Sequence, residues 1–322
     1  MSGVPVLAVH DVAKRFPVRQ GWLRRSVAEV RAVDGVSFEV HAGETLCVVG
    51  ESGCGKSTLG KLVLRLIEPS GGRIVIEGRD VTALGPEAMR AYRRRVQMVF
   101  QDPYSSLNPR LSAEEIITEP IANFERLDAV ARQDRAVELL QRVGLRPDLR
   151  ARRPFEFSGG QRQRLGIARA LSLRPALIIA DEPVSALDVS VQAQVLNLMM
   201  DLQEEFGLAY LFISHDLGVV EHIGHRIAVM YLGRIVELAE RDALFASPQH
   251  PYTEALIAAA PRPDPRARKT RAVIEGEVPS PMNPPAGCAF HPRCPYAVGR
   301  CREETPALRV TAAGRLVACH LR

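Results

Sequence analysis

A glycine-rich segment has the residue types and spacing of a phosphate-binding loop. It follows the pattern G-x-x-x-x-G-K-[ST], directly after the apolar run Thr45–Val49 and before a segment of helical spacing. Glycines let successive N–H groups converge on one anion, Lys56 reaches the β- and γ-phosphates, and the Ser57 hydroxyl completes a magnesium shell. A plain glycine-rich turn is disfavoured by the flanking strand and helix. The candidate binding residues are Gly50, Glu51, Ser52, Gly53, Cys54, Gly55, Lys56, Ser57 and Thr58.

Two carboxylates follow a second apolar run, Leu177–Ala180. A run without alternation predicts a parallel strand buried on both faces, and ligands gather at the carboxyl ends of such strands. Asp181 is placed to hold magnesium through water, and Glu182 is suited to polarise an attacking water. In isolation the pair would equally be read as a helix N-cap before Pro183. Combined with the phosphate-binding loop, the catalytic interpretation is favoured.

A third segment predicts a second anion site. Ser158, Gly159, Gly160 and Gln161 open a helix that continues to Leu173. The first turn of a helix has backbone N–H groups without intrahelical partners, and the serine adds a hydroxyl. One nucleotide needs only one phosphate-binding loop, so the second site requires an explanation.

These segments must be positioned by alternating strands and helices. Strands are predicted at Thr45–Val49, Arg73–Ile76, Val96–Phe100, Leu177–Ala180 and Tyr210–Ile213, and helices at Ser57–Ile67, Asp128–Val143, Gly159–Leu173 and Ser190–Phe206. Such alternation predicts an α/β layer fold. Residues 112–153 interrupt it with two helical stretches, which indicates a helical insertion. After a short helix at Tyr252–Ala260, frequent prolines up to Pro295 predict a loop-rich tail without regular helix or central strand.

Length and composition set outer bounds. The 322 residues are 46% hydrophobic and 25% charged, as in ordinary folded domains, and the length suggests one large domain and a smaller one. No apolar run reaches the ~18 residues of a membrane span, and Met1–Phe16 lacks the features of a signal peptide, so we expect a cytoplasmic chain. The net charge of +5 is small and spread out, so it says little about partners. We expect no nucleic acid.

Together the three segments resemble the ATP-binding cassette (ABC) ATPases, and the resemblance covers nearly the whole chain. In that family the Ser-Gly-Gly-Gln signature of one subunit covers the γ-phosphate held by the loop of another, so ATP joins a head-to-tail dimer. The resemblance implies that Phe16 stacks on adenine, that Gln101 senses magnesium and water, that Asp188 lies in the loop coupling the two ATP sites, and that His215 contacts the γ-phosphate. Phe157 departs from the leucine of many members. Alone, Phe16 would be read as a core aromatic and His215 as a turn histidine; their shared order favours the functional reading.

The tail resembles the C-terminal extension of the peptide and nickel importer branch. The resemblance rests on Ser247–Thr253, the proline-rich stretch, and Cys288, Cys294, Cys301 and Cys319. Members with all four cysteines are expected to bind a [4Fe-4S] cluster, and four thiolates match the usual ligation. The spacing contains no C-x-x-C, so a four-thiolate zinc site, with His291 or His320 substituting, and four reduced thiols stay open as alternatives. Either metal would staple a segment too proline-rich to form its own core.

The resemblance implies an α/β P-loop NTPase core with an antiparallel β subdomain and a helical subdomain at about 105–173. The cassette would span residues 1–250 and the extension residues 251–322. The function implied is ATP hydrolysis, with Mg²⁺, that energises a peptide importer at the cytoplasmic face of the inner membrane. Partners would be a second ATP-binding subunit, two transmembrane permease subunits and an extracytoplasmic substrate-binding protein. Alternatives are a nickel or other small-solute importer, a non-transport cassette ATPase acting on DNA or ribosomes, and a redox or iron-sensing regulator.

Overall fold

The computed structural model describes residues 3–20, 25–260, 276–312 and 314–322. The chain forms two compact units. The first unit comprises Met1–Val6, His41–Glu44 and Ala83–Phe212, and the second comprises Leu7–Val40, Thr45–Thr82 and Ile213–Arg322. No helix within the described ranges is long and apolar enough to cross a membrane.

The first unit places three strands in the order β8-β7-β6. β6 and β7 pair in parallel, with Val99 opposite Ala180. All five residues of β7 are buried, which confirms the predicted parallel strand within the fold. The elements are β6 (Val96–Val99), β7 (Leu177–Asp181), β8 (Ala209–Ile213), α2 (Pro86–Arg95), α3 (Pro103–Ser106), α4 (Ala113–Ala122), α5 (Ala129–Arg142), α6 (Gly159–Leu171), α7 (Val189–Phe206) and the 3₁₀ turns η1 (Pro147–Ala151) and η2 (Pro154–Glu156).

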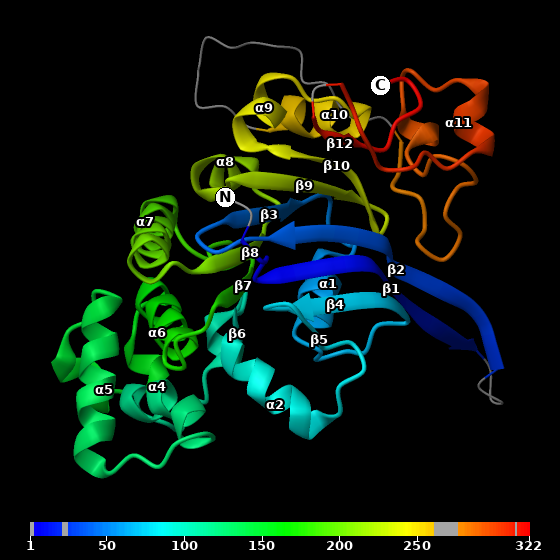
Figure 1. Ribbon diagram of the computed structural model, residues 1–322. Coiled ribbons are helices and arrows are strands. Elements are labelled where there is room, and N and C mark those ends of the chain that lie inside the picture. Colours follow the sequence, from blue (N-terminus) through cyan, green and yellow to red (C-terminus); the bar gives the residue numbers. More distant parts are fainter. Residues whose placement is uncertain (1–2, 21–24, 261–275, 313) are drawn as a thin grey trace, which may run out of the picture. The chain divides into compact units, whose positions relative to one another are not determined.

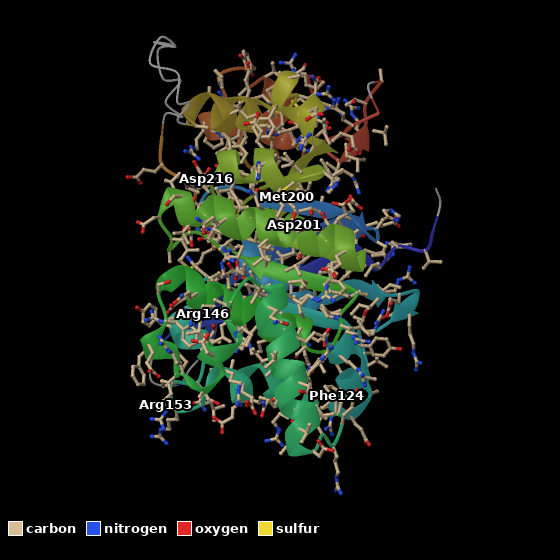
Figure 2. The ribbon with its side chains drawn as sticks, turned by 90° about the vertical axis from the view of Figure 1, so that its left-hand side faces the viewer. Phe124, Arg146, Arg153, Met200, Asp201 and Asp216 are labelled. Carbon is tan, nitrogen blue, oxygen red and sulfur yellow. The ribbon has the colours of Figure 1, made fainter. Side chains whose placement is uncertain are left out.

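The predicted helical insertion is present as α4, α5 and η1, and both α4 and α5 lie beside α6 (Figure 1). Ser112 and Glu115 form a reciprocal capping box at the start of α4, and the Asp128 carboxylate caps α5. Phe124, which follows α4 (Figure 2), lies under the guanidinium groups of Arg90 and Arg94 of α2, at 5.5 and 5.8 Å. These contacts tie the insertion to the helix that leads into β6.

The second unit contains two sets of strands. An antiparallel sheet has the order β2-β1-β4-β5, and a further set runs β11-β12-β10-β9-β3, in which β3 and β9 are parallel. The antiparallel sheet confirms the expected β subdomain. The elements are β1 (Leu7–Gln20), β2 (Arg25–Val40), β3 (Thr45–Val49), β4 (Gly71–Ile76), β5 (Arg79–Asp80), β9 (Arg226–Tyr231), β10 (Arg234–Glu240), β11 (Arg309–Val310), β12 (Leu316–Val317), α1 (Lys56–Val63), α8 (Leu217–Ile223), α9 (Arg241–Ala246), α10 (Pro251–Ala259), α11 (Gly299–Glu303) and η3 (His291–Arg293).

The helix predicted at Ser57–Ile67 is shorter in the structure, because α1 ends at Val63. Arg65 has a φ of 52°, a left-handed conformation that cannot continue a right-handed helix. Its guanidinium donates to the carbonyl oxygens of Val81 and Thr82. These tertiary hydrogen bonds override the apolar spacing that extends to Ile67.

The described part of the tail is loop-rich, as predicted, but it is also packed against strands. β12 pairs antiparallel with β10, placing Val317 opposite Glu237. Phe290 is 1% exposed and lies 5.4 Å from each of the rings of Tyr231 and Tyr252. The prolines of 261–275 lie outside the described residues. The sequence predicted that a metal site would hold the tail, and it did not predict this packing of Phe290 against the two tyrosines.

His250 makes the stability of this region pH-dependent. Burial lowers its pKa to about 4 from about 6.5, and its Nδ1 accepts a hydrogen bond from the backbone N–H of Tyr252 at the start of α10. The unfolded chain therefore binds more protons between these two pH values. The stabilisation is fully present above pH ~6.5 and is lost as the pH falls towards ~4, by up to about 3 kcal/mol.

We expect His250→Asn, which keeps an N-cap acceptor that does not titrate, to flatten the fall of the melting temperature between pH 7 and pH 4. The matched control is His222→Asn on the exposed side of α8. Melting curves across this pH range provide the measurement. An unchanged slope in His250→Asn would assign the pH dependence to other groups.

Candidate nucleotide-binding site

The glycine-rich loop connects the buried strand β3 to α1 in the second unit. Gly55 is the N-cap of α1, with a φ of 108°, and Lys56 is the first residue of the helix. The loop therefore presents a helix N-terminus and a run of backbone N–H groups to one side, which is the arrangement that binds phosphate. Ser57 and Thr58, both half-buried, lie in the first turn.

Two of the glycines are required by close backbone approach. A Cβ added at Gly50 would lie 2.1 Å from the carbonyl oxygen of Met230, and one at Gly55 would lie 2.0 Å from that of Ala32. Backbone atoms cannot move aside as the end of a flexible side chain can. At Gly53, by contrast, a Cβ would meet nothing within 4 Å.

We expect Gly55→Ala to abolish measurable ATP binding and to lower the melting temperature, because the loop cannot close against Ala32. Gly53→Ala is the matched control. Its φ of 81° imposes a left-handed conformation that costs about 1–2 kcal/mol, but the added methyl group enters open space. Nucleotide titration and thermal melting of both variants provide the test; equal losses of ATP affinity would contradict the steric argument.

Lys56 is 6% exposed and lies inside its own loop. Its Nζ donates to the carbonyl oxygens of Gly50 and Glu51, at 2.8 and 3.0 Å. The Cys54 sulfur lies 3.8 Å from the same Nζ. Burial raises the pKa of the Cys54 thiol, and the Lys56 ammonium opposes this rise without cancelling it. The Cys54 thiol is therefore uncharged where it lies beside Lys56 in the loop.

Two other predicted residues belong to the same unit. Phe16 is 37% exposed on β1, and the Lys14 Nζ lies 5.1 Å from its ring centroid. An exposed aromatic face with a cation beside it suits an adenine ring. His215 is exposed and follows β8, while the Asp216 carboxylate caps α8.

In the first unit, the structure brings Gln101 to Glu182. The Gln101 Nε2 donates to Glu182 Oε2 at 2.8 Å, although the two residues are 81 positions apart. Glu182 has a φ of 47°, a left-handed conformation directly after the end of β7, and Asp181 is 7% exposed at the end of that strand. The sequence indicates only that each residue follows a strand; the structure shows that the two strands are neighbours.

The signature segment forms a capping box at the start of α6. Ser158 Oγ accepts from the Gln161 N–H, and Gln161 Oε1 accepts from the Ser158 N–H. A Cβ at Gly160 would lie 2.4 Å from a methyl group of Val191. The signature therefore lies against the first turn of α7, whose exposed N-cap is Asp188. Sequence reasoning predicted both segments but not their contact.

Two of the four tail cysteines, Cys288 and Cys294, have raised pKa values. Burial is the main cause that raises the pKa of the Cys288 thiol, and Cys301, Cys294 and Cys319 raise it further. Burial is also the main cause that raises the pKa of the Cys294 thiol, with smaller contributions from Cys319, Cys301 and Glu254. Cys301 and Cys319 are buried, and the Cys288 N–H donates to the Cys301 carbonyl at 2.8 Å. Within the described ranges, no group of three or more His, Cys, Asp or Glu residues is arranged to hold a metal ion.

Sequence reasoning missed two residues at the phosphate-binding loop. The Tyr252 hydroxyl accepts a hydrogen bond from the Glu51 N–H at 2.9 Å, and Arg293 donates to both carboxylate oxygens of Glu51. These contacts join positions 201 and 242 residues apart. Nothing in the local sequence around Arg293 signals them.

The loop, the carboxylates after β7 and the signature define an ATP-binding cassette. Residues 33–185 match the family model for ABC transporters, and residues 236–301 match that for the oligopeptide/dipeptide transporter C-terminal region. The chain belongs to the family of ABC transporter ATP-binding proteins.

Several relatives match over almost the whole chain. A probable peptide ABC transporter ATP-binding protein of Sinorhizobium fredii is 66% identical, covering 98% of this chain and 90% of the relative. An oligopeptide transport ATP-binding protein of Bacillus subtilis is 54% identical, with 98% and 97% covered. A dipeptide transport ATP-binding protein of Haemophilus influenzae is 50% identical, with 99% and 97% covered.

Solved structures support the same fold. A dimeric ATP-binding cassette, in a post-hydrolysis state with ADP and Pi, is 28% identical with a TM-score of 0.65, covering 73% of this chain and 98% of that one. A part of an ABC transporter complex from Clostridium perfringens is 25% identical with the same TM-score, covering 76% and 91%.

Proposed function

We propose that this chain hydrolyses ATP to energise an importer of dipeptides or oligopeptides. The observation that carries this proposal is the phosphate-binding loop with its buried Lys56, in a chain whose relatives over nearly its whole length are named as peptide transport ATP-binding proteins. The match of residues 236–301 to the oligopeptide/dipeptide transporter C-terminal region supports the peptide branch.

The proposed chemistry is attack of water on the γ-phosphate. Lys56 and the loop N–H groups offset the charge of the phosphates. We assign to Glu182, which accepts a hydrogen bond from Gln101, the role of orienting and deprotonating water. Magnesium would be held by Ser57, Gln101 and, through water, Asp181, and it would neutralise phosphate charge. An alcohol, an amide and a carboxylate are oxygen donors that suit this ion.

The other residues complete a nucleotide sandwich between two ATPase subunits. In this proposal Phe16 stacks on adenine and His215 contacts the γ-phosphate. Ser158, Gly159, Gly160 and Gln161 of one subunit cover the γ-phosphate bound to the other, and Asp188 couples the two sites. The contact of the signature with the first turn of α7 supports this coupling, because a movement of the signature would displace the start of α7, where Asp188 lies.

The partners proposed are a second, distinct ATPase chain, two permease subunits and an extracytoplasmic binding protein. The chain would sit at the cytoplasmic face of the inner membrane through the permeases. We divide it into a cassette, residues 1–250, and an extension, residues 251–322.

Reconstituted transport tests the function. The chain would be purified after mild membrane extraction with its co-purifying subunits, placed in liposomes, and supplied with ATP, binding protein and labelled di- and oligopeptides. ATP-dependent peptide uptake is expected. Uptake of nickel alone would move the chain to the metal-importing branch, and recovery only with ribosomes or DNA would overturn the transport role.

For the four cysteines we propose a [4Fe-4S] cluster with a structural role. The hydrogen bond from the Cys288 N–H to the Cys301 carbonyl oxygen brings two of these cysteines together, and thiolates are the ligands of such clusters. An anaerobic preparation should be brown and contain iron and acid-labile sulfide in equal amounts, and Cys294→Ser should reduce both. A colourless protein that contains zinc would overturn the cluster in favour of a zinc site.

A further inference from the structure

Glu51, the second residue of the phosphate-binding loop, forms hydrogen bonds through its carbonyl oxygen, its backbone N–H and its carboxylate. Its carbonyl oxygen accepts from Lys56 Nζ at 3.0 Å, its N–H donates to the Tyr252 hydroxyl at 2.9 Å, and its two carboxylate oxygens accept from Arg293 at 2.8 and 3.1 Å. Only the first of these contacts comes from the loop itself. The other two come from the C-terminal segment of the chain.

The Arg293 contact is the stronger of the two, because it is charged, bidentate and buried. The Arg293 side chain is 6% exposed and that of Glu51 is 24% exposed. The hydrogen bonds to Glu51 raise the pKa of Arg293, so the guanidinium carries its charge throughout the accessible pH range. A bidentate guanidinium–carboxylate pair fixes orientation as well as distance.

A second anchor holds the other side of the loop. The Gly233 N–H, from the turn between β9 and β10, donates to the Cys54 carbonyl at 2.9 Å. The exposed Ser52 and Gly53 thus lie between two fixed points, Glu51 and Cys54. If the contacts of Glu51 were lost, more of the loop would have to become ordered on phosphate binding. The conformational entropy lost in that step would lower the affinity.

We propose that Arg293 and Tyr252 are positioning residues for ATP: they hold Glu51 so that the phosphate-binding loop is set before the nucleotide binds. The C-terminal extension then does more than mark the transporter branch. The packing of the extension then affects ATP affinity, because it places Arg293, the residue directly before Cys294. This inference rests on the ATP-binding role of the chain.

The full-length chain tests the proposal through the Kd for MgATP and the KM and kcat of hydrolysis. We expect Arg293→Met to raise Kd and KM about tenfold, equivalent to about 1.4 kcal/mol, with a much smaller change in kcat, because preorganisation contributes to ground state and transition state alike. Arg293→Lys keeps the charge but loses the fork, so its Kd should lie between wild type and Arg293→Met. Tyr252→Phe should also raise Kd.

A double-mutant cycle and a matched control separate positioning from folding. Glu51→Gln combined with Arg293→Met should raise Kd by less than the product of the two single effects, because either change alone breaks the same pair. Arg300→Met is the control, since Arg300 is an exposed residue of α11 that forms an ion pair with the exposed Glu304. Its Kd should equal that of wild type.

Thermal melting completes the design. If Arg293→Met lowers the melting temperature but the folded variant and Arg293→Lys bind MgATP like wild type, Arg293 is structural only and the proposal is overturned. Independent effects of Glu51→Gln and Arg293→Met would also overturn it. A wild-type chain that binds no MgATP would instead reject the proposed function, so the two failures are distinguishable.

Discussion

Replacement of Glu182 by Gln is expected to lower ATP turnover by about 10²–10⁴-fold, the range contributed by a positioned general base. The amide is the same size as the carboxylate, so the left-handed backbone at this position, with its φ of 47°, is no more strained than before. The residues of the phosphate-binding loop are unchanged, so MgATP should bind with its original affinity. Single-turnover hydrolysis and equilibrium nucleotide binding give the two measurements.

A substitution of Gln101 should lower ATP turnover in the same direction but by less. Gln101→Ala removes the 2.8 Å hydrogen bond that orients Glu182 but leaves the carboxylate, so turnover should fall less than in Glu182→Gln. Glu204→Gln, on the exposed side of α7, is the matched control and should leave turnover unchanged. Normal turnover in Glu182→Gln would remove this residue from the mechanism.

The strands and helices next to the site could be predicted because they obey short-range rules. β7 is an apolar run up to Ala180, α5 has helical spacing and an Asp128 cap, and Gly50 and Gly55 stand where backbone atoms approach closely. The end of α1 could not be predicted. It depends on Arg65, whose guanidinium donates to the carbonyl oxygens of Val81 and Thr82, 16 and 17 residues further along the chain and just after β5.

The site was predictable residue by residue but not in its long-range contacts. Gln101 and Glu182 were identified separately, and only the pairing of β6 with β7 shows that they meet. The contact of Arg293 with Glu51 is a different case. It depends on how a loop-rich segment packs, through Phe290 against Tyr231, and no periodic pattern encodes such packing.

Lys56→Arg is expected to bind MgATP about 10- to 150-fold more weakly, which corresponds to the loss of one charge-assisted hydrogen bond of about 1.5–3 kcal/mol. The charge is conserved, so the effect must come from shape. Lys56 is 6% exposed, and its compact ammonium lies within 3.0 Å of two loop carbonyls. A planar guanidinium is wider and cannot be directed at both these carbonyls and a phosphate from the same position.

Lys61→Arg, one and a half turns further along α1 on its exposed side, is the matched control, and its affinity for MgATP should equal that of wild type. Titration with MgATP and thermal melting of both variants separate the causes. A folded Lys56→Arg chain with wild-type affinity would show that charge alone suffices at this position. A loss confined to Lys56→Arg would show that the close fit of the loop around the ammonium, set at one end by Glu51, determines how ATP is held.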